Sequence, residues 1–331
     1  TTRKKASKDK MASSLPSDIQ TWEVKEPYLK LHCKLGEGPL LRARDQHAAL
    51  RRHHPEAAAH HLPRAGKSPG GLARHAAARH PDLGDGRHRG RRPQDKILIG
   101  AKYGMAVLDR KAAHGQKDAY EYVAKFHKMK DNLRLRGNDG AVDPHGRFWL
   151  GTMTDFELGP FQSEGSVHMF DGRKDAVVLK EGVTIPNSVS WSPDGRTMYF
   201  THSSAKTIHA YDYNASSSEK PISNERVFYA HEGPGEPDGH RIDVEGNLWT
   251  AVYGESHVLK VSGRTGKVVG EVKLPTRNIT CVEFVGTELL ITTAGMEEGA
   301  GSEQEVDYSG ALFRVDVGVE GVPPHEFKLD L

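Results

Sequence analysis

A short pattern that recurs at a regular spacing constrains the fold of this chain most strongly. In each copy a strand-like run leads into a polar turn that contains glycine, and a second strand-like run follows. The turn glycines are Gly146, Gly195 and Gly246, with Gly286 in a weaker copy, and they lie roughly 40–50 residues apart. This spacing is typical of a four-stranded propeller blade. Since the chain has 331 residues, about six blades fit, and the sequence predicts an all-β, six-bladed β-propeller.

The residues around each turn favour the same fold. Positive φ at a turn position favours glycine, and the aromatic residue three or four positions later (Trp149, Tyr199 or Trp249) is expected to pack between blades. The sequence has neither the long helical periodicity of an α/β protein nor an apolar run that approaches a membrane span. We expect one domain over residues 11–331, preceded by an upstream tail over residues 1–10, because Met11 begins a segment that looks like a natural start.

Residues 42–93 form an atypical segment within this domain. Between residues 42 and 92 there are eleven Arg, eight His, one Lys and four acidic residues, a net charge of +8, whereas the rest of the chain carries −6. The overall charge of +2 hides this contrast. The segment contains no Val, Ile, Thr, Phe, Tyr or Trp, the residues that favour strands. It therefore interrupts the first blade of an otherwise β-patterned chain.

Three interpretations of this segment stay open. It is a disordered linker with few apolar residues, or a basic arm for nucleic acid, against which its lack of interleaved aromatic residues counts. The third is a shifted reading frame. Codons permitted by residues 41–61 and 72–93, started one base later, can encode sequence that contains Val, Ile and Thr. Sequencing the encoding DNA distinguishes the third interpretation from the other two.

In a propeller the inner strand of each blade points its first residues toward the axis, so ligands are expected one per blade rather than in one compact motif. Polar motifs stand at these places in the chain. They are Gly36-Glu37-Gly38-Pro39, Arg136-Gly137-Asn138-Asp139-Gly140, Asp143-Pro144-His145-Gly146-Arg147-Phe148-Trp149, Pro186-Asn187-Ser188-Val189-Ser190-Trp191 and Pro237-Asp238-Gly239.

Taken together, these motifs resemble the regucalcin/gluconolactonase family, the senescence-marker-protein and luciferin-regenerating-enzyme group. The resemblance runs from about Trp22 to Leu41 and from about Lys96 to Leu331. It implies a six-bladed propeller with one divalent metal ion on its axis, and it implies lactone hydrolysis.

The metal ligands that the resemblance implies are Glu37, Asn187 and Asp238. Two carboxylates and an amide oxygen form a hard, oxygen-only site that suits Ca²⁺, Mn²⁺, Zn²⁺ or Mg²⁺ and leaves positions for water and substrate. Considered one at a time, these residues are also ordinary loop and turn residues. The prediction therefore depends on their occurring together.

Three further residues are expected to bind substrate. Arg136 and Asn138 match the family's substrate-binding pair, and an arginine fork suits paired hydrogen bonds to sugar oxygens. Asp155 stands close to where many animal members carry a pair of acidic residues. His202 replaces an Asp that is frequent in the family, and it either lines the pocket or has a packing role.

The predicted function is divalent-metal-dependent hydrolysis of sugar lactones to hydroxy acids, with Asp238, or a water that it orients, as the general base. Two alternatives stay open: an organophosphate-type ester hydrolase on the same site, and a calcium-binding or inactivated member of the family. The expected partner is a small lactone, without nucleic acid or membrane, and the expected assembly is a monomer or a weak homo-oligomer.

Cysteine and histidine usage completes the prediction. Cys33 and Cys281 are the two cysteines, and we expect buried thiols rather than a redox pair, in a reducing and therefore cytoplasmic setting. Eight of the 19 histidines lie in the atypical segment, and no His-x-x-x-His pair stands beside an acid in the blade pattern. The sequence therefore predicts no dedicated zinc site.

Overall fold

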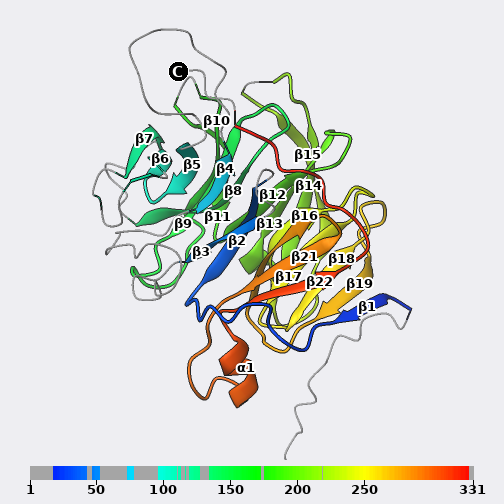
Figure 1. Ribbon diagram of the computed structural model, residues 1–331. Coiled ribbons are helices and arrows are strands. Elements are labelled where there is room, and N and C mark those ends of the chain that lie inside the picture. The colour runs from blue at the N-terminus through cyan, green and yellow to red at the C-terminus, as the bar shows by residue number, and fades with distance from the viewer. Residues whose placement is uncertain are drawn as a thin grey trace, which may run out of the picture.

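The computed structural model shows antiparallel sheets arranged as the blades of a propeller, with strands β8, β12 and β16 near the middle and β7, β15 and β19 near the periphery (Figure 1). The structure describes residues 18–42, 47–52, 73–77, 96–109, 111–112, 116, 119–126, 134–172, 175–217 and 219–327. The predicted all-β propeller is confirmed.

Each blade is a sheet in which consecutive strands are neighbours. The first blade contains β4 (Ala73–Ala77), β5 (Lys96–Ala101), β6 (Gly104–Asp109) and β7 (Tyr120–Lys125), and the second contains β8 (Leu135–Val142), β9 (Phe148–Thr154), β10 (Gly165–Phe170) and β11 (Val177–Val183). The third blade contains β12 (Pro186–Trp191), β13 (Thr197–His202), β14 (Thr207–Tyr213) and β15 (Ile222–Ala230), and the fourth contains β16 (Glu236–Ile242), β17 (Leu248–Tyr253), β18 (His257–Val261) and β19 (Val268–Lys273). The fifth blade contains β20 (Ile279–Val285), β21 (Glu288–Thr293) and β22 (Leu312–Asp316). A 3-10 turn (Ser203–Ala205) follows β13, and helix α1 (Glu303–Tyr308) lies between β21 and β22.

The prediction of six blades is corrected to five. Among the described residues the remaining sheet is a two-stranded hairpin, β2 (Gly36–Arg42) paired with β3 (His47–Arg52). The atypical segment begins at this point, and it lacks the residues that favour strands. It nevertheless supplies the backbone of β3 and of β4, which pair with β2 and β5. Here pairing with a neighbouring strand outweighs local propensity.

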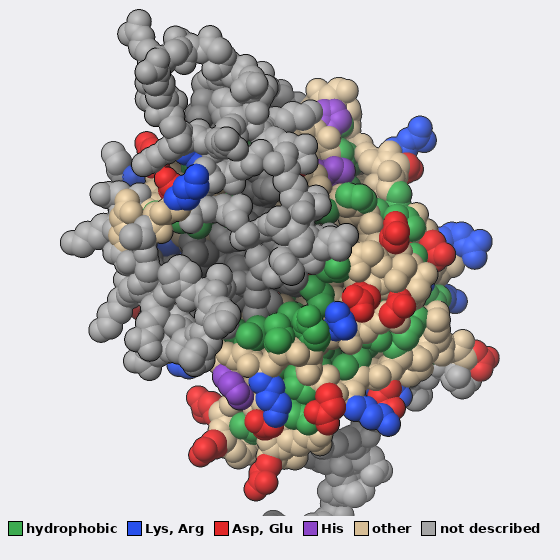
Figure 2. Space-filling model, viewed as in Figure 1, with side chains coloured by type: hydrophobic (Ala, Val, Ile, Leu, Met, Phe, Trp, Pro, Cys, Tyr) green, Lys and Arg blue, Asp and Glu red, His purple; other side chains and the backbone are tan. Residues whose placement is uncertain are grey.

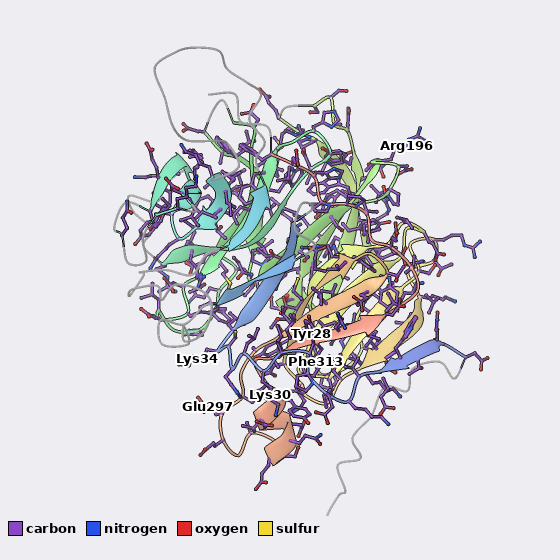
Figure 3. All side chains as sticks on the ribbon, in the orientation of Figure 1. Tyr28, Lys30, Lys34, Arg196, Glu297 and Phe313 are labelled. Carbon is purple, nitrogen blue, oxygen red and sulfur yellow. The ribbon has the colours of Figure 1, made fainter. Side chains whose placement is uncertain are left out.

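The N-terminal segment fastens the last two blades together. Strand β1 (Gln20–Glu23) pairs in parallel with β19, adding a fifth strand to the fourth blade. Leu29 then forms a bridge with Leu312 of β22, and the Cys33 N–H donates to the Gly310 carbonyl over 2.9 Å. Figure 3 shows Tyr28 and Lys30 of this segment beside Phe313 of β22 and helix α1.

The core lies between adjacent blades, as the aromatic residues of the repeat predicted. Trp149 of the second blade packs with Trp191 of the third, and the centroids of the two indole rings are 5.5 Å apart. Trp249 packs with Phe284 of the fifth blade, and Tyr199 belongs to a cluster that includes Leu248 of the fourth. Cys33 and Cys281 are buried free thiols, which confirms that expectation.

The repeated turn also braces the tryptophans. The Asp143 carboxylate accepts the Trp149 indole N–H, and Asp243 accepts that of Trp249, both over 2.9 Å. Both aspartates are fully buried. Gly146 and Gly246 close these turns with φ of 83° and 87°, as the pattern predicted.

The face drawn in Figure 2 carries acidic and basic side chains interspersed over its described surface. The α-helix that the described residues contain is six residues long, and none of the helices found there has the length and hydropathy to cross a bilayer.

Candidate functional site

The innermost strand of every blade has an irregularity near its start, and the predicted site residues lie there. The register shifts between Gly137 and Gly140 in β8, between Pro186 and Val189 in β12, and between Pro237 and His240 in β16. Strands β2, β4 and β20 have shifts at equivalent places. A bulge re-aims the side chains within it, so these positions present polar groups at one end of the inner strands.

Hydrogen bonds join three of these bulges in series. The Ser188 hydroxyl donates to Asp139 Oδ2 over 3.1 Å, and the Ser188 oxygen accepts the backbone N–H of His240 over 2.8 Å. All three side chains are buried. Strands β8, β12 and β16 are therefore held in a fixed relation at the end where the predicted ligands lie.

Asn187 and Asp238 are two of the predicted metal ligands. They lie inside the bulges of β12 and β16, the inner strands of the third and fourth blades. Their exposed fractions are 7% and 8%. Asn187 Nδ2 donates to Ser203 Oγ over 3.0 Å, which leaves the amide oxygen as the ligand atom. The third predicted ligand, Glu37, directly precedes the β2 bulge, but its side chain is outside the described residues.

The predicted substrate residues lie at the same end of the second blade. Arg136 is 5% exposed, and its guanidinium carbon lies 4.4 Å from the centre of the Phe156 ring. Asn138 lies in the β8 bulge and donates to the Pro186 carbonyl over 2.8 Å. Asp155 directly follows β9 and forms an ion pair with Lys102.

His202 is half-buried at the end of β13. Its Nε2 atom accepts the backbone N–H of Thr184 over 3.0 Å. Burial lowers the pKa of His202, and His209 and Lys180 lower it further, against an opposing effect of Glu225. These contacts favour the packing role over a contact with substrate.

The sequence analysis did not predict a role for His240, which follows Asp238 by two residues and is fully buried. Its Nδ1 atom lies 2.8 Å from Thr201 Oγ1, and its Nε2 atom lies 2.6 Å from Ser190 Oγ. Its place two residues after Asp238 was the signal that could have revealed it. The imidazole ties β16 to β12 and β13 beside the predicted ligands.

A buried ion pair supports the next boundary between blades. Arg241 of β16 donates through Nε to Glu283 Oε2 of β20 over 2.9 Å. Burial lowers the pKa of Arg241, but the Glu283 carboxylate outweighs this and raises it above its ordinary value. Gly239 lies so close to Cys281 and Thr280 that a Cβ there would collide with both.

The structure also brings together His231, Glu255 and His257, a group of potential metal ligands that the sequence analysis did not predict. His231 precedes β16, Glu255 lies in the turn after β17, and His257 begins β18. The sequence motifs predicted no dedicated zinc site, and this group is a candidate that the fold brings together without such a motif. Glu255 and His257 are close in sequence, but His231 lies 24 residues before Glu255, so the three form no short motif.

The comparisons with known proteins agree with this architecture. A family described as "SMP-30/Gluconolactonase/LRE-like region" matches residues 47–295. Regucalcin of Danio rerio is 36% identical over 207 residues, which are 60% of this chain and 68% of the relative. A pentonolactonase of Haloferax volcanii is 34% identical over 203 residues, which are 59% of this chain and 67% of the relative. A luciferin-regenerating enzyme structure aligns with a TM-score of 0.74 at 25% identity, over 92% of this chain and all of that one.

The family match and the fold thus place the chain among the lactonase-like β-propellers, with polar residues gathered at one end of its inner strands. The family match extends over most of the chain and includes the motifs around Asn138, Asn187 and Asp238. The chain belongs to the SMP-30/gluconolactonase/LRE-like family, as its motifs indicated.

Proposed function

We propose that this protein is a divalent-metal-dependent hydrolase that opens sugar lactones to hydroxy acids. The observation that carries the proposal is the series of hydrogen bonds from Asp139 through Ser188 to the His240 backbone. It fixes the bulges that contain Asn138, Asn187 and Asp238 relative to one another. The names of relatives, a pentonolactonase among them, support the substrate class.

The donor set fits a divalent cation. Asp238 and Asn187 offer a buried carboxylate and a buried amide oxygen on neighbouring strands, and Glu37 follows the same positional rule on β2. Oxygen donors of this kind suit Ca²⁺, Mg²⁺ or Mn²⁺, and Zn²⁺ also accepts carboxylate ligands. A cation held by these residues supplies Lewis-acid polarisation of a lactone carbonyl and acidification of a water molecule.

The protein's own residues then have distinct tasks. Asp238 accepts a proton from the attacking water, whose oxygen forms a bond to the carbonyl carbon. The ring C–O bond breaks, and the leaving oxygen takes up the proton that Asp238 accepted, becoming the hydroxyl of the product acid. Arg136 and Asn138 orient the sugar through hydrogen bonds, and the exposed ring of Phe156 forms a wall beside Arg136. Asp155, paired with Lys102, is the third residue on the substrate side.

The test is a pH-stat assay of the full chain on a panel of aldonolactones, after chelation and after adding back Ca²⁺, Mn²⁺, Zn²⁺ or Mg²⁺. We expect a rate that chelation removes and a cation restores. Asp238→Asn should abolish turnover with every added cation, whereas Asp194→Asn, in an exposed turn, should leave turnover and its cation requirement unchanged.

Three outcomes would contradict the proposal or a part of it. Retained hydrolysis in Asp238→Asn removes that residue from the mechanism. Tight cation binding without turnover on any lactone of the panel indicates a binding protein rather than an enzyme. Hydrolysis of phosphotriesters in place of lactones indicates the organophosphate-type alternative.

A further inference from the structure

His231, Glu255 and His257 form a compact group at the end of the fourth blade where β16 begins. His231 Nε2 lies 2.7 Å from Glu255 Oε2, and His257 Nε2 lies 3.3 Å from the same oxygen. Their side chains are 4%, 11% and 13% exposed. Two imidazole nitrogens therefore face one carboxylate oxygen in a nearly dry environment.

The opposite nitrogen of each imidazole is already held by the protein. His231 Nδ1 lies 2.9 Å from the Tyr229 hydroxyl, and His257 Nδ1 lies 3.0 Å from Glu271 Oε1. In metal sites a histidine ligand characteristically makes such an outer hydrogen bond, which fixes its orientation and leaves the other nitrogen to bind the ion. Both Nε2 atoms here are arranged in this way.

The inner side of the group contains an unsatisfied atom. His257 Nε2 is buried and makes no hydrogen bond among the residues that the structure describes, although it lies near Glu255. A buried nitrogen that makes no hydrogen bond is costly, and a bound ion is one recognised way to satisfy it.

The backbone beside the group leaves room that a side chain would fill. A Cβ at Gly233 would lie 2.5 Å from His231 Nε2 and 2.6 Å from Glu255 Oε2. The Gly235 N–H donates to Glu255 Oε1 over 3.1 Å, which fixes the carboxylate and turns Oε2 toward the histidines. The glycines therefore shape a small space around the three ligand atoms.

We propose that His231, Glu255 and His257 bind a divalent transition metal of the zinc type, with a fourth coordination position open. Two imidazoles and a carboxylate are a characteristic zinc donor set, and calcium does not favour nitrogen ligands. Zinc ligands at about 2.0–2.1 Å from a tetrahedral ion lie roughly 3.3 Å from one another. The His257–Glu255 separation already matches, and the His231–Glu255 pair would widen as its shared proton is lost.

This site is distinct from the one proposed at Asn187 and Asp238, and it shares no ligand with it. His231 belongs to the connection between the third and fourth blades, Glu255 lies in the β17–β18 turn, and His257 begins β18. A bound ion would fasten this connection to the fourth blade a few residues before Asp238. The inference does not depend on lactone hydrolysis.

Cobalt(II) titration of the full chain, with zinc as a competitor, tests the proposal. We expect a visible d–d absorption typical of four-coordinate cobalt, displaced by one equivalent of zinc, and a zinc-dependent rise in melting temperature. His257→Ala and Glu255→Gln should lose this equivalent. The matched control His209→Ala, another half-buried histidine beside a glutamate, should keep it.

Two gentler variants preserve all three ligands. Tyr229→Phe removes the outer hydrogen bond of His231 and should weaken cobalt binding roughly tenfold. Gly233→Ala places a methyl group against the ligand atoms and should weaken it at least as much. Each variant is checked for a native β-sheet circular dichroism spectrum before titration.

Asp238→Asn separates the two metal proposals, because it should lose turnover while it keeps the cobalt signal. If wild-type protein gives no such signal, or if folded His257→Ala gives the same signal as wild type, the zinc-type site is refuted, whatever the lactonase assay shows. Weak binding by the histidines of residues 42–92 would be equal in every variant, so it cannot imitate the expected loss.

Discussion

The Ser188 hydroxyl donates a hydrogen bond to Asp139 Oδ2 over 3.1 Å, across the boundary between two blades. The Ser188 hydroxyl oxygen also accepts the His240 N–H. Ser188→Ala therefore removes one hydrogen bond from the buried Asp139 carboxylate and one from the buried His240 amide. We expect this change to lower the free energy of unfolding by about 1–3 kcal/mol. Urea denaturation measures the change, and lactone hydrolysis should fall with it.

Ser216→Ala is the matched control, because this exposed serine lies in a turn of the third blade. Its free energy of unfolding should change by no more than about 0.5 kcal/mol. Equal stability of the two variants would show that the connection between bulges contributes nothing measurable.

Two copies of the same turn predict very different costs for the same substitution. Asp143 is fully buried and holds the Arg147 guanidinium over 2.6 Å as well as the Trp149 indole. Asp143→Ala should cost about 3 kcal/mol, because it leaves a buried cation without its carboxylate. In the copy of this turn that contains Gly195, Ser192 stands where Asp143 does, and Asp194 lies two residues further on. Asp194 is exposed, so Asp194→Ala should cost no more than about 1 kcal/mol. Thermal and urea denaturation of the pair measure the contrast, and similar losses would contradict it.

Arg136 should contribute to substrate affinity through its planar fork, which lysine cannot reproduce. Arg136→Lys is expected to raise KM for the preferred lactone roughly tenfold, equivalent to about 1.4 kcal/mol. Arg134→Lys is the control, because Arg134 pairs with Glu164 and its side chain is 42% exposed. An unchanged KM in Arg136→Lys would remove this residue from the substrate site.

Stability should fall in mildly acidic solution, partly through His202. Its pKa lies below the ordinary value because it is buried and because His209 and Lys180 are close. The unfolded chain therefore binds the proton more readily, and stability is lost as the pH falls below about 6.5. Protonation also destroys the acceptor for the Thr184 N–H.

Urea denaturation at pH 7.5 and pH 5.5 measures this loss. His202→Gln, which keeps a polar acceptor but does not titrate, should lose less stability than wild type over the same interval. Equal losses in the two proteins would assign the acid sensitivity to other groups.

The repeat made much of the fold predictable, because each copy contains its own turn and its own inter-blade aromatic residue. Trp149 and Trp249 occupy their expected positions for that local reason. Strand β3 was not predictable, because its sequence has few strand-forming residues and its pairing with β2 decides its conformation. The shortfall from six blades to five also has its origin in that segment.

The candidate site was predictable only in part. Short motifs around Asn187 and Asp238 could be recognised as such, and the structure adds the bulges that present them. The roles of Ser188 and His240 depend on contacts between blades, to which a linear pattern gives no access. The same holds for His231 and Glu255, which are 24 residues apart and meet through the sheet.

The parallel pairing of β1 with β19 has a consequence for how the protein is made. Gln20 has its partner at Gly270, far along the chain, so β1 has no place to dock until β19 has been synthesised. Contacts between residues so distant in sequence form late and slow folding. Once β19 has formed and before β1 docks on it, this outer edge of the fourth blade is open to pairing with another chain. Nascent chains that stop short of β19 would leave the N-terminal strand unpaired, and it is there that a chaperone would be needed.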